Sequence, residues 1–186
     1  MATNNENVFY FLPMSQPPTM HPCERVGIDY VDTAPHRYAN SVDLAITPDQ
    51  LFEVFADADA WPRWAKVIRH VEWTSPLPPG VGSTRVVSML GGLEGAEEFL
   101  LWEPGRRMGF RFNEASERSI RAFAERYDVE PTAHGCRLTW TLALDVTGPG
   151  KHFMPVSGLV SNLSFRWFLR NLRRYTDQRF ATARSS

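Results

Sequence analysis

The sequence has little cysteine, no long apolar stretch and no excess of either charge. Only two cysteines occur in 186 residues, Cys23 and Cys136, and the first lies among prolines, so a disulfide framework has no support. A chain of this kind fits a reducing compartment, and we expect a cytoplasmic protein. The first thirty residues also lack the basic region and long apolar core of a secretory signal peptide.

Two classes of partner are disfavoured by the composition. No stretch approaches the roughly 18 uninterrupted apolar residues that a membrane-spanning helix requires, so we expect no membrane insertion. The formal net charge is only −1. The chain as a whole therefore has no electrostatic attraction to nucleic acid, and we expect no nucleic-acid partner.

Common catalytic signatures are missing as well. No serine lies in a G-x-S-x-G motif, which removes the usual sign of a hydrolase. The five histidines are scattered without an H-E-x-x-H motif, and the cysteines do not have zinc-finger spacing. We therefore expect neither a metal ion nor any other cofactor.

The chain divides into two parts by composition. Residues 1–35 contain five prolines, too many for a helix or a central strand, and are predicted to form an N-terminal arm. Residues 36–186 are predicted to form one globular domain. The run Val8–Leu12 is strongly apolar, so the arm is either a disordered leader or a segment that docks on the domain or on a second subunit. A homodimer that involves the arm is thus one expectation.

The globular part begins with a strand and two helices. Residues 38–46 alternate between apolar and polar side chains, which indicates a strand. Thr47, Pro48 and Gln50 follow in the positions of a helix start with a capping box. A second short helix is predicted from Trp61 to Val67, where two tryptophans three residues apart can point the same way.

Six segments with a period of two follow, separated by turns rich in glycine and proline. Such short connections favour antiparallel neighbours. The chain then ends in an amphipathic helix over about residues 155–182, in which Phe165, Leu169 and Leu172 share one face. That apolar face must lie on an apolar surface. The six segments are residues 68–74, 82–90, 96–102, 108–113, 119–130 and 136–147.

This order of elements resembles the helix-grip architecture of the START-like superfamily, which includes the Bet v 1 relatives and the polyketide cyclase/dehydrase-like proteins. Three motifs carry the resemblance over residues 36–182: Trp61-Pro62-Arg63-Trp64, the hairpin segment 102–108, and the strand segment 135–142. The resemblance implies an α+β fold, with a curved antiparallel sheet of six to seven strands around the long C-terminal helix and two short helices after the first strand. It further implies a ligand cavity between the sheet and that helix, lined by one face of each strand, so that residues 36–186 form a START-like ligand-binding domain.

The alternation of side chains predicts which residues face the implied cavity. In the last strand, Trp140 and Leu142 belong to the apolar set. Trp61 and Trp64 in the short helix are either core residues or neighbours of the cavity entrance. Asn162 is either a hydrogen-bonding group for a ligand or part of the solvated flank of the last helix. The predicted ligand-binding residues are Trp61, Trp64, Met89, Met108, Phe110, Phe112, Phe123, Trp140, Leu142, Asn162, Phe165 and Leu169.

One strand carries polar side chains among its aromatic ones. Arg121, Glu125 and Tyr127 alternate with small residues on a face that also holds Phe123. Buried charges are costly unless they are paired or used, so Arg121 and Glu125 either pair inside the cavity as catalytic or anchoring groups or lie near the solvent-exposed mouth of the sheet. A third alternative is that the predicted phase of this strand is wrong. We name Glu125, Arg121 and Tyr127 as the catalytic candidates.

Three functions remain open from the sequence. The first is a non-catalytic carrier or sensor of a small hydrophobic molecule, lipid-like or polyketide-like. The second is an enzyme of the polyketide aromatase/cyclase or dehydratase type that uses the same cavity. The third is a protein-interaction module whose pocket is closed by its own side chains. The resemblance does not choose among them, because one fold supports many functions.

Overall fold

A curled antiparallel sheet forms the body of the protein. In the computed structural model, which describes residues 18–148 and 154–181, the strands follow the order β2-β8-β7-β6-β5-β4-β3, and β1 pairs with β6. The strands are β1 (His21–Pro22), β2 (His36–Leu44), β3 (Ile68–Trp73), β4 (Thr84–Met89), β5 (Glu94–Glu103), β6 (Arg107–Ala115), β7 (Ile120–Thr132) and β8 (Gly135–Val146).

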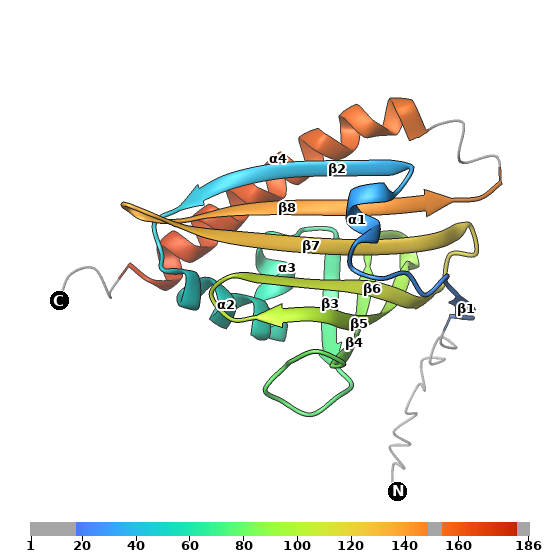
Figure 1. Ribbon diagram of the computed structural model, residues 1–186, viewed down its shortest axis with the longest axis horizontal. Helices are drawn as coiled ribbons and strands as arrows, with labels where there is room; N and C mark the ends of the chain where they lie inside the picture. Colours follow the sequence, from blue (N-terminus) through green and yellow to red (C-terminus); the bar gives the residue numbers. More distant parts are fainter. Residues whose placement is uncertain (1–17, 149–153, 182–186) are drawn as a thin grey trace, which may run out of the picture.

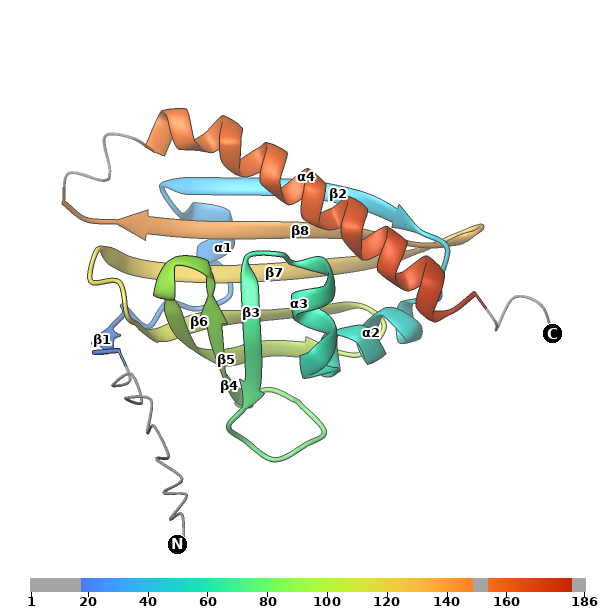
Figure 2. The same ribbon diagram turned by 180° about the vertical axis from the view of Figure 1, so that it is seen from behind.

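The long helix α4 (Met154–Arg179) crosses the concave face of this sheet, in front of β2 and β8 in Figure 2. Phe168, Leu169 and Leu172 of α4 are buried, and Leu172 is fully inaccessible to solvent. An amphipathic helix laid on a curved sheet is the helix-grip arrangement, so the predicted fold is confirmed. Among the described residues, no helix combines the length and the apolar character that crossing a membrane requires.

Two short helices close one end of the sheet. Helix α2 (Pro48–Ala56) starts with the predicted capping box, in which Thr47 Oγ1 accepts from the Gln50 amide at 3.2 Å and Gln50 Oε1 accepts from the Thr47 amide at 3.0 Å. A single 3₁₀ turn, η1 (Ala58–Ala60), leads to α3 (Trp61–Trp64). Helix α3 ends three residues earlier than predicted, because Ala65 leaves the helical region with ψ at 83°. A second 3₁₀ turn, η2 (Leu90–Gly92), joins β4 to β5.

The described part of the predicted arm lies on the convex face of the sheet, opposite α4 (Figure 1). The Cys23 amide donates to the Asn113 carbonyl of β6 at 2.9 Å, and Val31 in α1 (Tyr30–Thr33) is fully buried against small residues of β7 and β8. Gly109 permits this close approach, because a Cβ there would stand 2.3 Å from Ile28 Cδ1. The run Val8–Leu12 lies outside the described residues.

Candidate functional site

A cavity of about 420 Å³ lies between the sheet and α4. Its walls come from α3, from β3 to β8 and from the described part of α4, and most of them are apolar. Small-molecule sites in proteins span roughly 300–1,000 Å³, so the cavity has the size of a ligand site. A pocket closed by its own side chains would hold no more than a few waters at about 30 Å³ each, which contradicts the hypothesis of an interaction module with a filled pocket.

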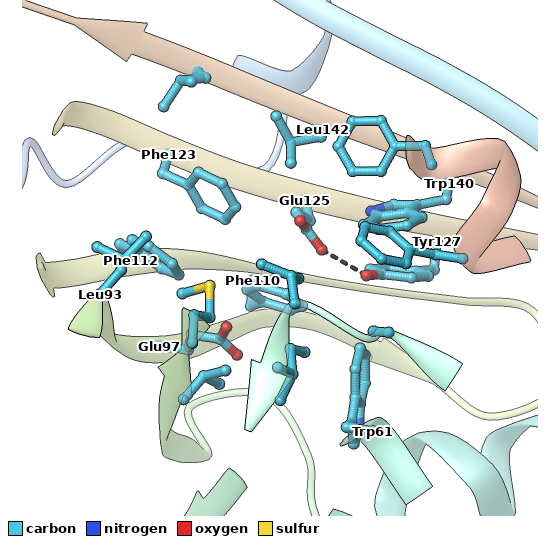
Figure 3. Close-up of a pocket in the computed structure, with 18 of the residues that line it drawn as sticks. Trp61, Leu93, Glu97, Phe110, Phe112, Phe123, Glu125, Tyr127, Trp140 and Leu142 are labelled. Atoms are coloured by element: carbon cyan, nitrogen blue, oxygen red, sulfur yellow. Dashed lines mark hydrogen bonds between the residues drawn. The ribbon is translucent and has the colours of Figure 1, made fainter. Parts of the chain in front are cut away.

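Nine of the twelve predicted ligand-binding residues line this cavity. They converge from different strands and helices because the inward side chains of a curved sheet point toward a common centre, as Figure 3 shows for several of them. Their role in binding stays a prediction. The nine are Trp61, Trp64, Met89, Phe110, Phe112, Phe123, Trp140, Leu142 and Phe165.

Three predicted residues lie elsewhere. Met108 is fully buried in the core cluster that includes Phe55 of α2, since α2 fills that end of the sheet. Asn162 Oδ1 accepts a hydrogen bond from Asn40 Nδ2 of β2 at 3.0 Å, which holds its amide against the edge of the sheet. Leu169 packs into the core and borders a groove between α4 and β2. The prediction that these three line the cavity is wrong.

Arg121 also lies outside the cavity. The pairing of β7 with β8 shifts its register between Ile120 and Ala122, and this bulge turns Ile120 inward and Arg121 outward. The Arg121 side chain is 54% exposed and forms an ion pair with Asp145. The predicted pairing of Arg121 with Glu125 inside the cavity is therefore wrong, because strict alternation fails at a bulge.

Glu125 and Tyr127 do face the cavity and form a hydrogen-bonded pair. The Tyr127 hydroxyl donates to Glu125 Oε2 at 2.5 Å, drawn as a dashed line in Figure 3. Both side chains are buried, with 6% of Glu125 and none of Tyr127 exposed. Tyr127 is held in place by stacking on Trp140 of the neighbouring strand, with 5.4 Å between ring centroids. The carboxyl group of Glu125 thus has a fixed position on the cavity wall.

A second polar pair faces the same cavity and was missed by the sequence analysis. Arg85 of β4 and Glu97 of β5 are cross-strand partners, and Arg85 Nε donates to Glu97 Oε2. Their side chains are 1% and 4% exposed. The Arg85 guanidinium lies over the Trp61 ring, 4.1 Å from its centroid. The available signal was that Arg85, Val87 and Met89 alternate on one face of β4, which places a charge on an apolar face.

The environment of Glu125 favours its neutral form. The pKa of Glu125 is raised to about 8, chiefly by burial and also by the charge of Glu97, while the Tyr127 hydroxyl, Arg85 and the Trp140 indole oppose the rise. Burial also raises the pKa of Glu97, although Arg85 opposes this shift. The pKa of Tyr127 lies well above its ordinary value because of burial and the adjacent carboxyl. At neutral pH the Glu125 side chain is thus a carboxylic acid that can donate a proton or a hydrogen bond.

Several donors of the cavity wall have no partner among the described residues. They are Trp64 Nε1, Arg85 Nη1 and Trp140 Nε1. By contrast, Trp61 Nε1 donates to the Phe55 carbonyl at 3.0 Å. In Figure 3 the Trp140 indole nitrogen lies on the side of its ring that faces Glu125, near enough to lower the pKa of that carboxyl group but without a hydrogen bond of normal geometry. A buried donor without a partner costs about 1–3 kcal/mol, and an accepting group of a bound molecule would remove that cost.

Solved structures with the same architecture include a START superfamily protein from Mycobacterium smegmatis, with a TM-score of 0.64 and 14% identity, covering 77% of this chain and 98% of that one. The protein TTHA0849 from Thermus thermophilus also gives a TM-score of 0.64, with 16% identity, 81% of this chain covered and 100% of the other. At these identities the likeness shows the fold alone.

Nearer relatives occur in mycobacteria. The uncharacterized protein Rv2574 of Mycobacterium tuberculosis is 59% identical over 167 residues, which cover 90% of this chain and 100% of the relative. The uncharacterized protein Mb2604 of Mycobacterium bovis gives the same values. Residues 35–177 match the family described as polyketide cyclase / dehydrase and lipid transport. This match spans most of the chain, including strands β2 to β8 and all but the last two residues of α4, so the protein belongs to the polyketide cyclase / dehydrase and lipid transport family, whose fold binds hydrophobic ligands.

Proposed function

We propose that this protein is a non-catalytic carrier or sensor that holds one small, largely apolar molecule between its sheet and α4. The observation that carries the proposal is the cavity of about 420 Å³, whose apolar walls meet a polar cluster of Arg85, Glu97, Glu125 and Tyr127. Apolar walls supply affinity through buried area, and a few polar groups fix the orientation of the guest.

Native mass spectrometry of the purified protein tests this proposal. Leu142 lines the cavity and Thr139 points to the outer face of the same strand, so Leu142→Phe and Thr139→Phe form a matched pair. We expect a retained small molecule in the wild type and in Thr139→Phe, and its loss in Leu142→Phe, because the added ring fills part of the cavity. Equal occupancy in both variants would contradict binding in this cavity.

A second function is favoured by one specific observation, the raised pKa of Glu125 beside Tyr127. A carboxylic acid that is neutral near pH 7 can act as a general acid toward a carbonyl oxygen, and its carboxylate can act as a base. The enzyme candidate is therefore a cyclase or dehydratase acting on a polyketide-like substrate, with Glu125 moving the proton and Tyr127 positioning it.

A comparison of Glu125→Gln with Arg121→Ala separates the enzyme from the carrier. Turnover of a poly-carbonyl substrate is expected to fall by about 10²–10⁴-fold when a general acid is removed. Arg121 lies on the outer face, so Arg121→Ala is the control with unchanged turnover. Activity that survives in Glu125→Gln would exclude Glu125 as the acid, and a wild type without turnover would leave the carrier as the function.

A further inference from the structure

The unpartnered buried polar atoms of the cavity wall are all hydrogen-bond donors within the described part of the chain. The rings of Trp64 and Trp140 are adjacent, with 6.0 Å between their centroids. The centroid of the Trp64 ring also lies 5.1 Å from that of Trp61, and the Arg85 guanidinium lies over the Trp61 ring. The three unpartnered atoms, on Trp64, Arg85 and Trp140, thus belong to one continuous wall. Indole and guanidinium N–H groups cannot accept hydrogen bonds, so only a ligand with an accepting atom can satisfy them.

The charges of the cavity are already balanced. Among the described residues that line it, Arg85 is the only cation, and Glu97 is its ion-pair partner through a direct hydrogen bond. Glu125 adds a second carboxyl group, which its raised pKa keeps protonated at neutral pH. A carboxylate ligand would therefore enter a buried site without a free counter-ion, and a buried unpaired charge is strongly unfavourable.

We propose that the cavity selects neutral ligands that carry an accepting oxygen, such as aromatic ketones, over carboxylates such as free fatty acids, and that Glu97 sets this selectivity by occupying Arg85. The inference rests on the proposed function, since it names the ligand class of the same cavity. Glu97 acts through Arg85 and is a specificity-determining residue, whereas the unpartnered N–H groups of Trp64, Arg85 and Trp140 are the donors that a ligand oxygen meets.

Three probes with one ring system isolate the polar group: 2-acetylnaphthalene, 2-naphthoate and 2-ethylnaphthalene. Isothermal titration calorimetry at pH 7 measures their affinities for the wild type. Satisfying one buried donor is expected to make the ketone bind about tenfold more tightly than the hydrocarbon. The carboxylate is expected to bind at least about tenfold more weakly than the ketone, because its charge has no partner in the cavity.

Glu97→Gln tests the role of the ion pair, with Glu98→Gln as the matched control, because Glu98 is the next residue on β5 and pairs with Arg111 outside the cavity. The first variant leaves Arg85 without a counter-charge, which 2-naphthoate can then supply. We expect the ratio of ketone to carboxylate affinity to fall by at least about tenfold in Glu97→Gln and to stay unchanged in Glu98→Gln, because Arg85 bonds to Glu97 whereas Glu98 accepts from Arg111. Circular dichroism and thermal melting establish that each variant is folded.

Trp64→Phe and Trp140→Phe provide a test that does not depend on the ion pair, because each keeps an aromatic ring and removes an N–H. The ketone should lose its advantage over the hydrocarbon in the variant whose N–H it uses, while hydrocarbon affinity is retained. Trp167→Phe, at an exposed position of α4, is the control. If Glu97→Gln does not fold, these variants and the ratios of probe affinities in the wild type still test the inference.

The outcomes separate the inference from the proposed function. Tighter or equal binding of 2-naphthoate relative to the ketone in the wild type overturns the inference while the carrier stands. A folded Glu97→Gln with an unchanged ratio overturns the role of Glu97. If none of the three probes binds, the hydrocarbon included, the proposed function itself is overturned.

Discussion

Charged residues lie on both faces of the sheet, and the two faces surround them differently. On the convex face, Arg126 pairs with Asp32 and with Asp128 at 2.9 Å each, and its partners are partly exposed to water. On the concave face, Arg85 and Glu97 are almost completely buried, and Arg85 Nη1 has no partner among the described residues. The same residue types are thus hydrated on one face and desolvated on the other.

This difference in the burial of ion pairs indicates that the concave face carries the functional site. Exposed ion pairs contribute little to stability and cost little, so they need no functional explanation. A buried ion pair is often no better for stability than apolar side chains of the same volume. Buried charges and shifted pKa values that gather in one cavity are therefore typical of a binding or catalytic site.

The largest expected effect comes from breaking the buried pair. Arg85→Met leaves the Glu97 carboxylate buried without its partner, and we expect a loss of about 3–5 kcal/mol in the free energy of unfolding. Arg121→Met, on the convex face, should cause no measurable loss. Urea denaturation of both variants at pH 7 makes the comparison. Similar losses in the two variants would mean that the two faces do not differ as described.

The next largest effect is expected in the pH dependence of folding stability, through Glu125. Because the pKa of Glu125 is raised to about 8 in the folded state, the folded protein binds more protons than the unfolded chain between the ordinary pKa and about 8. Stability from this group is therefore complete below the ordinary glutamate pKa and is lost as the pH rises toward about 8, by at most about 1.4 kcal/mol per pH unit. Glu125→Gln should remove this part of the pH dependence and be more stable than the wild type at pH 8. Parallel curves of stability against pH for the two proteins would refute the shift.

A smaller effect is expected at the partner of Glu125. Tyr127→Phe removes the hydroxyl that donates to Glu125, at an expected cost of about 1 kcal/mol. That hydrogen bond lowers the folded-state pKa of Glu125, so its loss should move the pH at which the decline in stability ends upward. Ser41→Ala, which removes a hydroxyl pair with Thr139 on the convex side, is the control with no shift. A downward shift in Tyr127→Phe would show that the hydroxyl does not stabilise the carboxylate.

Alternation of side chains predicted most of the concave face correctly. Leu138 and Trp140 are buried as expected, and Leu142 lines the cavity, because β8 is central in the sheet and its period of two is unbroken. Glu125 and Tyr127 also face inward as predicted. Arg121 differs because a bulge adds one residue to β7, and such a shift leaves no mark in the alternation of the sequence.

The Arg85–Glu97 pair could not be found from alternation alone. Each residue lies in a strand of mixed polarity, and their proximity depends on the register of β4 with β5, which places them opposite each other. The docking of the arm depends likewise on contacts between distant segments, such as Ile28 over Gly109. Features that a single segment determines, such as the capping box at Thr47, were predicted; features that require pairing between segments were not.

The most direct test of the account is calorimetric titration of 2-acetylnaphthalene into the wild type, Leu142→Phe and Thr139→Phe. We expect saturable binding of one molecule per chain to the wild type and to Thr139→Phe, and at least about tenfold weaker binding to Leu142→Phe, because only that ring occupies the cavity. Equal affinity for all three proteins would contradict the claim that the concave face of the sheet holds the ligand.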